Sequence, residues 1–257
     1  SFPMGIDVSK FESYQNTEEF KKKLKALQEK KDSKKNILSV DRLDYSKGIL
    51  QRLLAFELFL KSHPKWIGNC QLTLVLVPSR TEVSSYQSMK KAIDEKIGFI
   101  NGNFGSLNWT PIIYLYKGFS FEDLVPLYSN SDVLLVTPFR DGMNLVAKEF
   151  LISEMNGVLI LSEMAGAAEE LPEAILVNPN DLFSVSNAIH QALEMDPKEI
   201  KRRNSVMKDR LSKNSVAHWA DRIYRETFLA LEENLSIRNQ FPQIHLYYFQ
   251  KIQRTIF

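Results

Sequence analysis

Two cations lie close together in the stretch 40–48, which has the sequence VDRLDYSKG. Arg42 and Lys47 bracket a turn that follows an apolar run and opens an expected helix. The first N–H groups of a helix have no intrahelical partner, and with two cations beside them they suit a diphosphate. A second interpretation stays open here, in which Arg42 pairs with Asp41 or Asp44 and Lys47 lies in solvent. The glycine spacing differs from that of a Walker loop.

Two carboxylates lie in the stretch 137–149, TPFRDGMNLVAKE, at a spacing that suits one long ligand. Asp141 and Gly142 stand at an expected turn, and Glu149 follows about two helical turns later. The turn leads into backbone N–H groups that are free for an anion or a sugar hydroxyl, those of Met143, Asn144 and Leu145. The alternative is that Asp141 caps the helix and Glu149 is exposed to solvent.

A third candidate, Arg80, follows the apolar run 72–77, and Pro78 stiffens the backbone that leads to it. Arg80 can reach an anionic substrate, and an ion pair with Glu82 fits the sequence equally well. The small residues of stretch 161–170 allow either a ligand or a neighbouring helix to approach closely. The stretch 101–105, NGNFG, is expected to form a flexible loop before a strand.

The elements that must position these residues alternate along the chain. The expected strands are short runs rich in Val, Ile and Leu without polar alternation, at 37–40, 72–77, 112–116, 133–137, 158–161 and 175–177. Helix-sized stretches separate them, at 47–62, 83–98, 120–130, 143–155, 164–170 and 182–195, and charged helical stretches cover 20–33 and 197–236. This alternation predicts an α/β fold with a Rossmann-like, doubly wound parallel sheet, in which ligands bind beyond the carboxyl ends of the strands.

The composition narrows the function classes. The formal net charge of the 257 residues is +2, so no nucleic-acid partner is indicated. The single cysteine, Cys70, excludes an internal disulfide and a cysteine-rich zinc site, and it fits a reducing compartment. No apolar run reaches about 18 residues, so no membrane span is expected. The histidines lack ligand spacing and Asp41 to Asp44 is not an Asp–x–Asp pair, so no metal is expected.

Several stretches, in the right order, resemble the trehalose-6-phosphate synthases, which are retaining glucosyltransferases of the GT-B architecture. The matching stretches are 40–48, 78–80, 100–112, 131–150 and 157–171, together with FPMGID at 2–7 and VNP at 177–179. The string RDGMNLVAKE at 140–149 is highly specific for this family. The resemblance runs from about residue 2 to residue 230 and concerns only the second, C-terminal, nucleotide-sugar-binding domain of such enzymes.

This resemblance implies roles for the candidate residues. Arg42 and Lys47 would be the catalytic cations that hold the diphosphate of UDP-glucose and stabilise the departing UDP. Asp141 would contact glucose hydroxyls, Glu149 the ribose, and Arg80 the phosphate of the acceptor glucose 6-phosphate. The turn would offer backbone donors to the sugar nucleotide, from Gly142, Met143, Asn144 and Leu145. The product would be α,α-trehalose 6-phosphate, made without a metal or cofactor beyond the UDP-glucose substrate.

The resemblance also sets the expected organisation. Residues 1–232 would form the UDP-sugar-binding domain, and 233–257 a C-terminal tail of uncertain structure. The first GT-B domain has no counterpart here and the chain lacks an initiator methionine, so we expect a fragment of a cytoplasmic enzyme that is incomplete for catalysis alone. A homo-oligomer of the whole protein stays open. Open alternatives are another phosphorylated acceptor such as glycerol 3-phosphate, a nucleotide other than UDP, and a non-catalytic regulatory module. A glycogen- or sucrose-synthase-like enzyme fits the string around Asp141 less well.

Overall fold

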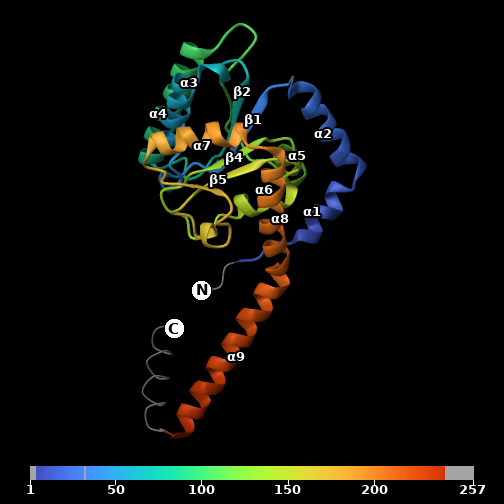
Figure 1. The fold of residues 1–257 in the computed structure, drawn as a ribbon. Helices are drawn as coiled ribbons and strands as arrows, with labels where there is room; N and C mark the ends of the chain where they lie inside the picture. The colour runs from blue at the N-terminus through green and yellow to red at the C-terminus, as the bar shows by residue number, and fades with distance from the viewer. Residues whose placement is uncertain (1–3, 32, 241–257) are drawn as a thin grey trace.

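The computed structural model describes residues 4–31 and 33–240, and a parallel sheet forms its centre (Figure 1). Its strands are short and apolar because both faces are covered by helices. They lie in the order β3-β2-β1-β4-β5-β6, and all the pairings are parallel. The strand bounds are β1 Lys35–Arg42, β2 Cys70–Val77, β3 Ile112–Leu115, β4 Val133–Val136, β5 Val158–Ser162 and β6 Ile175–Val177. The predicted fold class and all six predicted strands are therefore confirmed.

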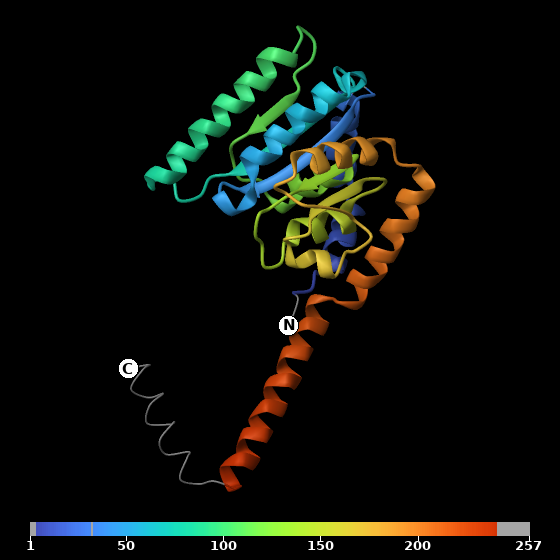
Figure 2. The same ribbon diagram turned by 60° about the vertical axis from the view of Figure 1, so that its left-hand side comes forward.

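Helices cover the sheet in two layers. Alternate strand residues point to opposite faces, so Ile37 and Leu38 belong to different hydrophobic cores. The core that contains Ile37 packs against α3 Ile49–Ser62, α4 Ser84–Phe104 and α7 Leu182–Glu194. The core that contains Leu38 packs against α1 Val8–Gln15, α2 Glu18–Lys31, α5 Phe121–Ser129, α6 Leu145–Ser153 and α8 Pro197–Lys213. Figures 1 and 2 show these two layers, with α9 Val216–Gln240 projecting away from them.

The predicted helices need four corrections. The expected helix 47–62 is split into a 3-10 turn, η1 Tyr45–Lys47, and α3, because Gly48 between them has a left-handed conformation. The expected helix 164–170 is only a 3-10 turn, η3 Gly166–Glu169. Helix α1 was not predicted. A further 3-10 turn, η2 Pro64–Trp66, follows the end of α3.

The stretch 101–105 is the fourth correction, because residues 101–104 form the last turn of α4 rather than a flexible loop. The side chain of Asn101 explains the difference. Its Oδ1 accepts a hydrogen bond from the Ile112 N–H at 2.9 Å, and its Nδ2 donates to the Ile112 carbonyl at 3.0 Å. The Gly105 N–H closes the turn on the Asn101 carbonyl at 2.9 Å. These contacts with β3 offset the low helix propensity of Asn and Gly.

The C-terminal expectation falls partly outside the described residues. Helix α9 continues to Gln240 and so passes through residue 232, where a domain was expected to end. The aromatic stretch 241–249 lies outside the described ranges. Among the helices that are described, none is long and apolar enough to cross a membrane.

Candidate functional site

The strand order creates a switch point between β1 and β4. From β1 the chain proceeds outward through β2 and β3, whereas from β4 it proceeds the other way through β5 and β6. The loops after β1 and β4 therefore leave the sheet in opposite directions, and a crevice at the carboxyl ends of these strands is where such folds bind ligands. We call residues 43–48 the β1 loop, 137–144 the β4 loop and 163–167 the β5 loop.

Backbone contacts join the β1 loop to the β4 loop. The Phe139 N–H donates to the Ser46 carbonyl at 2.8 Å, and the Arg140 N–H reaches the same oxygen at 3.3 Å. Gly48 has φ +63°, and a Cβ there would lie 2.7 Å from the Thr137 carbonyl oxygen. Only glycine fits this position without displacing the β4 loop. The two candidate stretches are thus held at a fixed distance.

The β4 and β5 loops are joined in the same way. The Gly166 N–H donates to the Asp141 carbonyl at 2.9 Å, and the Ala167 N–H donates to the Met143 carbonyl at 2.8 Å. A Cβ on Gly166 would lie 2.2 Å from the Gly142 carbonyl oxygen. The sequence left two uses open for these small residues, and the structure shows that they pack against the β4 turn. The β5 loop thus supports the β4 turn through backbone hydrogen bonds.

Lys47 and Asp141 meet across the switch point. The distance from Lys47 Nζ to Asp141 Oδ2 is 2.5 Å, and the two side chains are 13% and 16% exposed. Asn144 Nδ2 also donates to Asp141 Oδ2, at 3.1 Å. Lys47 is therefore not simply solvated, and Asp141 is not the helix cap. The cap of α6 is Asn144, whose Oδ1 accepts from the Ala147 N–H at 3.0 Å.

Arg42 ends β1 beside this pair, and its side chain is exposed. It forms no ion pair with any residue in the ranges 4–31 and 33–240, so the sequence-based alternative of a pair with Asp41 or Asp44 is wrong. Asp41 instead pairs with Arg52, and Asp44 accepts two hydrogen bonds from Ser46. The Arg42 guanidinium remains available for an anion.

The start of α6 carries backbone N–H groups without a hydrogen-bond partner, close in sequence to Asp141 of the ion pair with Lys47. Asn144 has φ +76°, a conformation that costs about 1–3 kcal/mol for a residue other than glycine and that clusters at functional sites. Within the described part of the chain, no acceptor is paired with the backbone N–H groups of Met143, Asn144 and Leu145. The three donors therefore remain unpaired, as predicted. Helix starts of this kind bind anions and sugar hydroxyls.

Glu149 lies two turns further along α6 and is half-buried. Its Oε2 accepts a hydrogen bond from the Tyr128 hydroxyl at 3.0 Å. Burial raises the pKa of Glu149 above its usual value, and the hydrogen bond from Tyr128 opposes that rise only in part. The alternative in which Glu149 is simply exposed to solvent is therefore wrong. The carboxylate keeps one oxygen without a protein partner among the described residues.

Arg80 follows β2 at the same edge of the sheet, with its residue exposed and φ at +49°. Its Nη1 donates to the Tyr86 hydroxyl at 2.9 Å, and no ion pair with Glu82 forms. The carboxyl edge therefore carries Arg42, Lys47, Asp141 and Arg80, which follow or end the neighbouring strands β1, β4 and β2. The stretch 101–105, which precedes β3, is not among them.

Sequence reasoning missed Arg52, which lies under the site on α3. Its side chain is 1% exposed and binds Asp41 Oδ2 through Nη1 at 2.5 Å. Nη1 also contacts the Ser39 hydroxyl, Nε donates to Thr137 Oγ1 at 2.9 Å, and Nη2 donates to the Lys47 carbonyl at 2.9 Å. One guanidinium thus joins β1, the β1 loop and the β4 loop. The only signal in the sequence was an arginine next to the apolar residues of a largely apolar helix.

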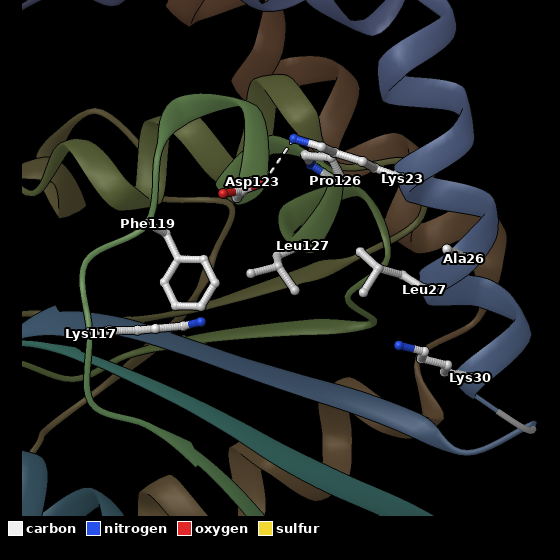
Figure 3. Close-up of a pocket in the computed structure, with 9 residues that line it drawn as sticks. All are labelled: Lys23, Ala26, Leu27, Lys30, Lys117, Phe119, Asp123, Pro126 and Leu127. Atoms are coloured by element: carbon white, nitrogen blue, oxygen red, sulfur yellow. Dashed lines mark hydrogen bonds and ion pairs between the residues drawn. The ribbon is translucent and has the colours of Figure 1, made fainter.

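A different hollow, of about 370 Å³, lies on the other side of the molecule from α3, between α2, α5 and the segment after β3 (Figure 3). Phe119, Leu127 and Leu27 form its apolar floor, and lysines stand at its rim. Lys23 is paired with Asp123 at 2.8 Å. The lining contains none of the candidate site residues.

Residues 1–227 match the family model described as glycosyltransferase family 20. The chain belongs to glycosyltransferase family 20. It is 47% identical over 226 residues to a bifunctional trehalose-6-phosphate synthase/phosphatase of Thermoproteus tenax, covering 87% of this chain and 31% of that protein. It is 43% identical to a UDP-forming α,α-trehalose-phosphate synthase of Pichia angusta, covering 88% of this chain and 48% of the relative.

Solved members of the family share the fold. An E. coli structure bound with UDP-2-fluoro glucose superimposes with a TM-score of 0.84 at 39% identity, over 88% of this chain and 50% of that one. A UDP-forming synthase from Burkholderia xenovorans in complex with glucose-6-phosphate gives a TM-score of 0.84 at 36% identity, over 87% of this chain and 50% of that one. This family 20 chain thus spans about half the length of the solved relatives and of the Pichia angusta protein, and about a third of the Thermoproteus tenax protein. The resemblance seen in its sequence is confirmed.

Replacing Arg52 with Ala is expected to lower the free energy of unfolding by about 3–5 kcal/mol, because Asp41 would stay buried without its cation. Arg42→Ala is the matched control, and its exposed, unpaired side chain predicts a change within about 0.5 kcal/mol. Urea denaturation of both variants measures the difference. Similar losses for the two arginines would show that the buried network does not support the site.

Proposed function

We propose that this chain binds the sugar-nucleotide donor of a UDP-forming trehalose-phosphate synthase, which transfers glucose from UDP-glucose to glucose 6-phosphate with retention. The observation that carries the proposal is the contact between Lys47 and Asp141 across the switch point. It brings a phosphate-binding cation and a hydroxyl-binding carboxylate together at the start of a helix. The names of the relatives and their solved complexes support the same donor and acceptor.

The geometry suits a sugar nucleotide laid along α6. Lys47 and the free Arg42 would bind the diphosphate, and the unpaired N–H groups at the start of α6 would add further donors. When Lys47 turns to the phosphates, it releases Asp141 Oδ2 to accept glucose hydroxyls. Glu149, two turns along the helix, would accept the ribose hydroxyls. The sugar and the ribose would thus bind at opposite ends of one fixed segment.

The same cations would assist the reaction. As the bond from glucose to the diphosphate breaks, negative charge grows on the departing UDP, and Arg42 and Lys47 stabilise it. In this proposal no metal ion or cofactor is required, because the two positive charges of Arg42 and Lys47 would face the diphosphate. Asp141 and Glu149 act as binding groups rather than as the acid and nucleophile of a two-carboxylate glycosidase.

The acceptor would bind mostly to residues that this chain does not contain. Its solved relatives are about twice as long, and we propose that a second, N-terminal domain completes the site in a protein that acts in the cytoplasm. From this chain, Arg80 would bind the phosphate of glucose 6-phosphate.

Replacing Lys47 with Ala tests the donor site directly. We expect UDP affinity to fall about ten- to hundredfold, the value of a charge-assisted hydrogen bond, and uridine affinity to change little. Isothermal titration calorimetry with both ligands measures this. Lys30→Ala, on α2 at the rim of the other hollow, is the matched control. Equal losses for UDP and uridine would place Lys47 away from the phosphates, and no binding of UDP-glucose by the folded protein would favour a regulatory module.

The raised pKa of Glu149 predicts how nucleoside binding depends on pH. Only the carboxylate accepts hydrogen bonds from both ribose hydroxyls, so uridine affinity should fall as the pH drops through the Glu149 pKa, which burial places above the usual 4.5. Calorimetry between pH 7.5 and pH 4.5 follows this loss. Glu149→Gln should bind more weakly at neutral pH and show a flat profile over that range. An unchanged pH profile in this variant would assign the titration to another group.

The identity of the acceptor is tested with the full-length protein. Release of UDP from UDP-glucose is expected with glucose 6-phosphate and not with glycerol 3-phosphate, which presents a phosphate but no sugar ring. Chromatography of the product identifies α,α-trehalose 6-phosphate. Product formed only from glycerol 3-phosphate would overturn the trehalose assignment and leave the donor site in place.

A further inference from the structure

We propose that Tyr86 is a positioning residue, which holds Arg80 ready for the phosphate of the acceptor and so sets the preference for a phosphorylated sugar. This inference rests on the proposed function, because it takes Arg80 as the acceptor's phosphate ligand. It adds a residue outside the stretches that carry the family resemblance. It also explains how an arginine on an exposed loop can act as part of a defined site.

Arg80 needs such support. It lies on the segment between β2 and α4, its residue is exposed, and its backbone has φ +49°. A free arginine side chain has many rotamers, and fixing it on a ligand costs conformational entropy of up to about 2 kcal/mol. Contacts that restrict the side chain before the ligand arrives reduce this cost.

Tyr86 supplies two such contacts. Arg80 Nη1 donates to the Tyr86 hydroxyl at 2.9 Å, and the centre of the guanidinium lies 5.6 Å from the centroid of the tyrosine ring. The ring and the hydroxyl therefore restrict the guanidinium together. Only one of its five N–H donors is used by Tyr86, so the others remain for a phosphate.

Tyr86 is itself held in place. It is 5% exposed in the first turn of α4, and its ring meets that of Tyr45 edge-on with centroids 6.4 Å apart. Its hydroxyl also faces Asp44 Oδ2 at 3.5 Å, a long contact in which the O–H donates to the carboxylate. With its proton turned toward Asp44, the hydroxyl presents its lone pairs to Arg80. The geometry is an ordered series from Arg80 through Tyr86 to Asp44.

Asp44 connects this series to the donor site. Its Oδ1 accepts from the Ser46 N–H at 2.9 Å and from the Ser46 hydroxyl at 2.7 Å, which caps the turn that ends at Lys47. Burial alone would raise the pKa of Asp44, but these bonds and the charge of Lys47 outweigh it and lower the pKa. The ionised Asp44 thus places Arg80 at a fixed position relative to the β1 loop.

If Tyr86 served only to pack its ring, its hydroxyl would not matter for acceptor binding. The ring fills space between α4 and the β1 loop, and phenylalanine would fill it equally well. The hydroxyl alone makes the hydrogen bonds with Arg80 and Asp44, whereas phenylalanine would keep the ring near the guanidinium. Tyr86→Phe therefore removes the hydrogen-bonded positioning contact and keeps the packing.

The test is the Tyr86→Phe substitution in the full-length protein. We expect KM for glucose 6-phosphate to rise about tenfold, with kcat and the Kd for UDP nearly unchanged, because one hydrogen bond to a charged group is lost. The preference for glucose 6-phosphate over glucose should fall by a similar factor. Titration of glucose 6-phosphate in the presence of UDP gives the same comparison as a binding measurement. Tyr116→Phe, which removes a hydroxyl that has no hydrogen bond to any described residue, is the matched control.

The outcomes separate this proposal from the proposed function. If Arg80→Ala raises KM for glucose 6-phosphate but Tyr86→Phe does not, Arg80 binds the phosphate without help from Tyr86 and the positioning role is overturned. A loss of UDP affinity equal to the loss for glucose 6-phosphate would show that Tyr86 only supports the loops. If Arg80→Ala has no effect on glucose 6-phosphate, or the unaltered protein does not bind it, the acceptor assignment fails and the role of Tyr86 fails with it.

Discussion

The buried guanidinium of Arg52 is the interaction on which the arrangement of the site depends. It is almost fully enclosed and touches the side chains of Ser39, Asp41 and Thr137 and the carbonyl of Lys47. A buried charge is tolerated only when it is paired and hydrogen-bonded, so the partners of Arg52 are constrained to one geometry. Those partners lie on β1, on the β1 loop and just after β4. The ion pair therefore ties together the two segments that must meet at the switch point.

Backbone hydrogen bonds hold the β1, β4 and β5 loops together. The β4 loop donates to Ser46 on one side and accepts from Gly166 and Ala167 on the other. Glycine at 48 and at 166 allows carbonyl groups to approach at distances that a Cβ would block. The backbones of the β1 and β4 loops, which carry candidate side chains, are thus fixed by contacts of their own. This is the pre-organisation that a site stabilising developing charge requires.

The ion pair between Lys47 and Asp141 has a different character from that of Arg52 and Asp41. Its side chains are 13% and 16% exposed, against 1% and 4% for Arg52 and Asp41. A diphosphate offers Lys47 more negative charge than one carboxylate does. We infer that the pair holds both groups in position while the site is free and separates when the donor binds. The family 20 chain thus contains one fully buried ion pair under the candidate site and a second, less buried one at the switch point.

Much of the fold followed from local pattern alone. Six apolar runs without polar alternation identified the strands, and the residue types after them indicated a phosphate-binding edge. A family resemblance then assigned roles that spacing had left open. Local pattern failed at 101–105, where the Asn101 side chain binds β3, and at 164–170, where packing against the β4 turn leaves only a 3-10 turn.

The tertiary structure alone decided which residues are partners. Lys47 meets Asp141, Arg52 meets Asp41, and Arg80 meets Tyr86, and the sequence pointed to none of these pairs. The physical reason is that hydrophobic periodicity reports how each segment is buried and carries no information about strand order. Lys47 meets Asp141 because β1 lies next to β4, and that adjacency arises only when the whole sheet assembles. By itself the sequence determined the chemistry available at the carboxyl edge, and the strand order determined which groups act together.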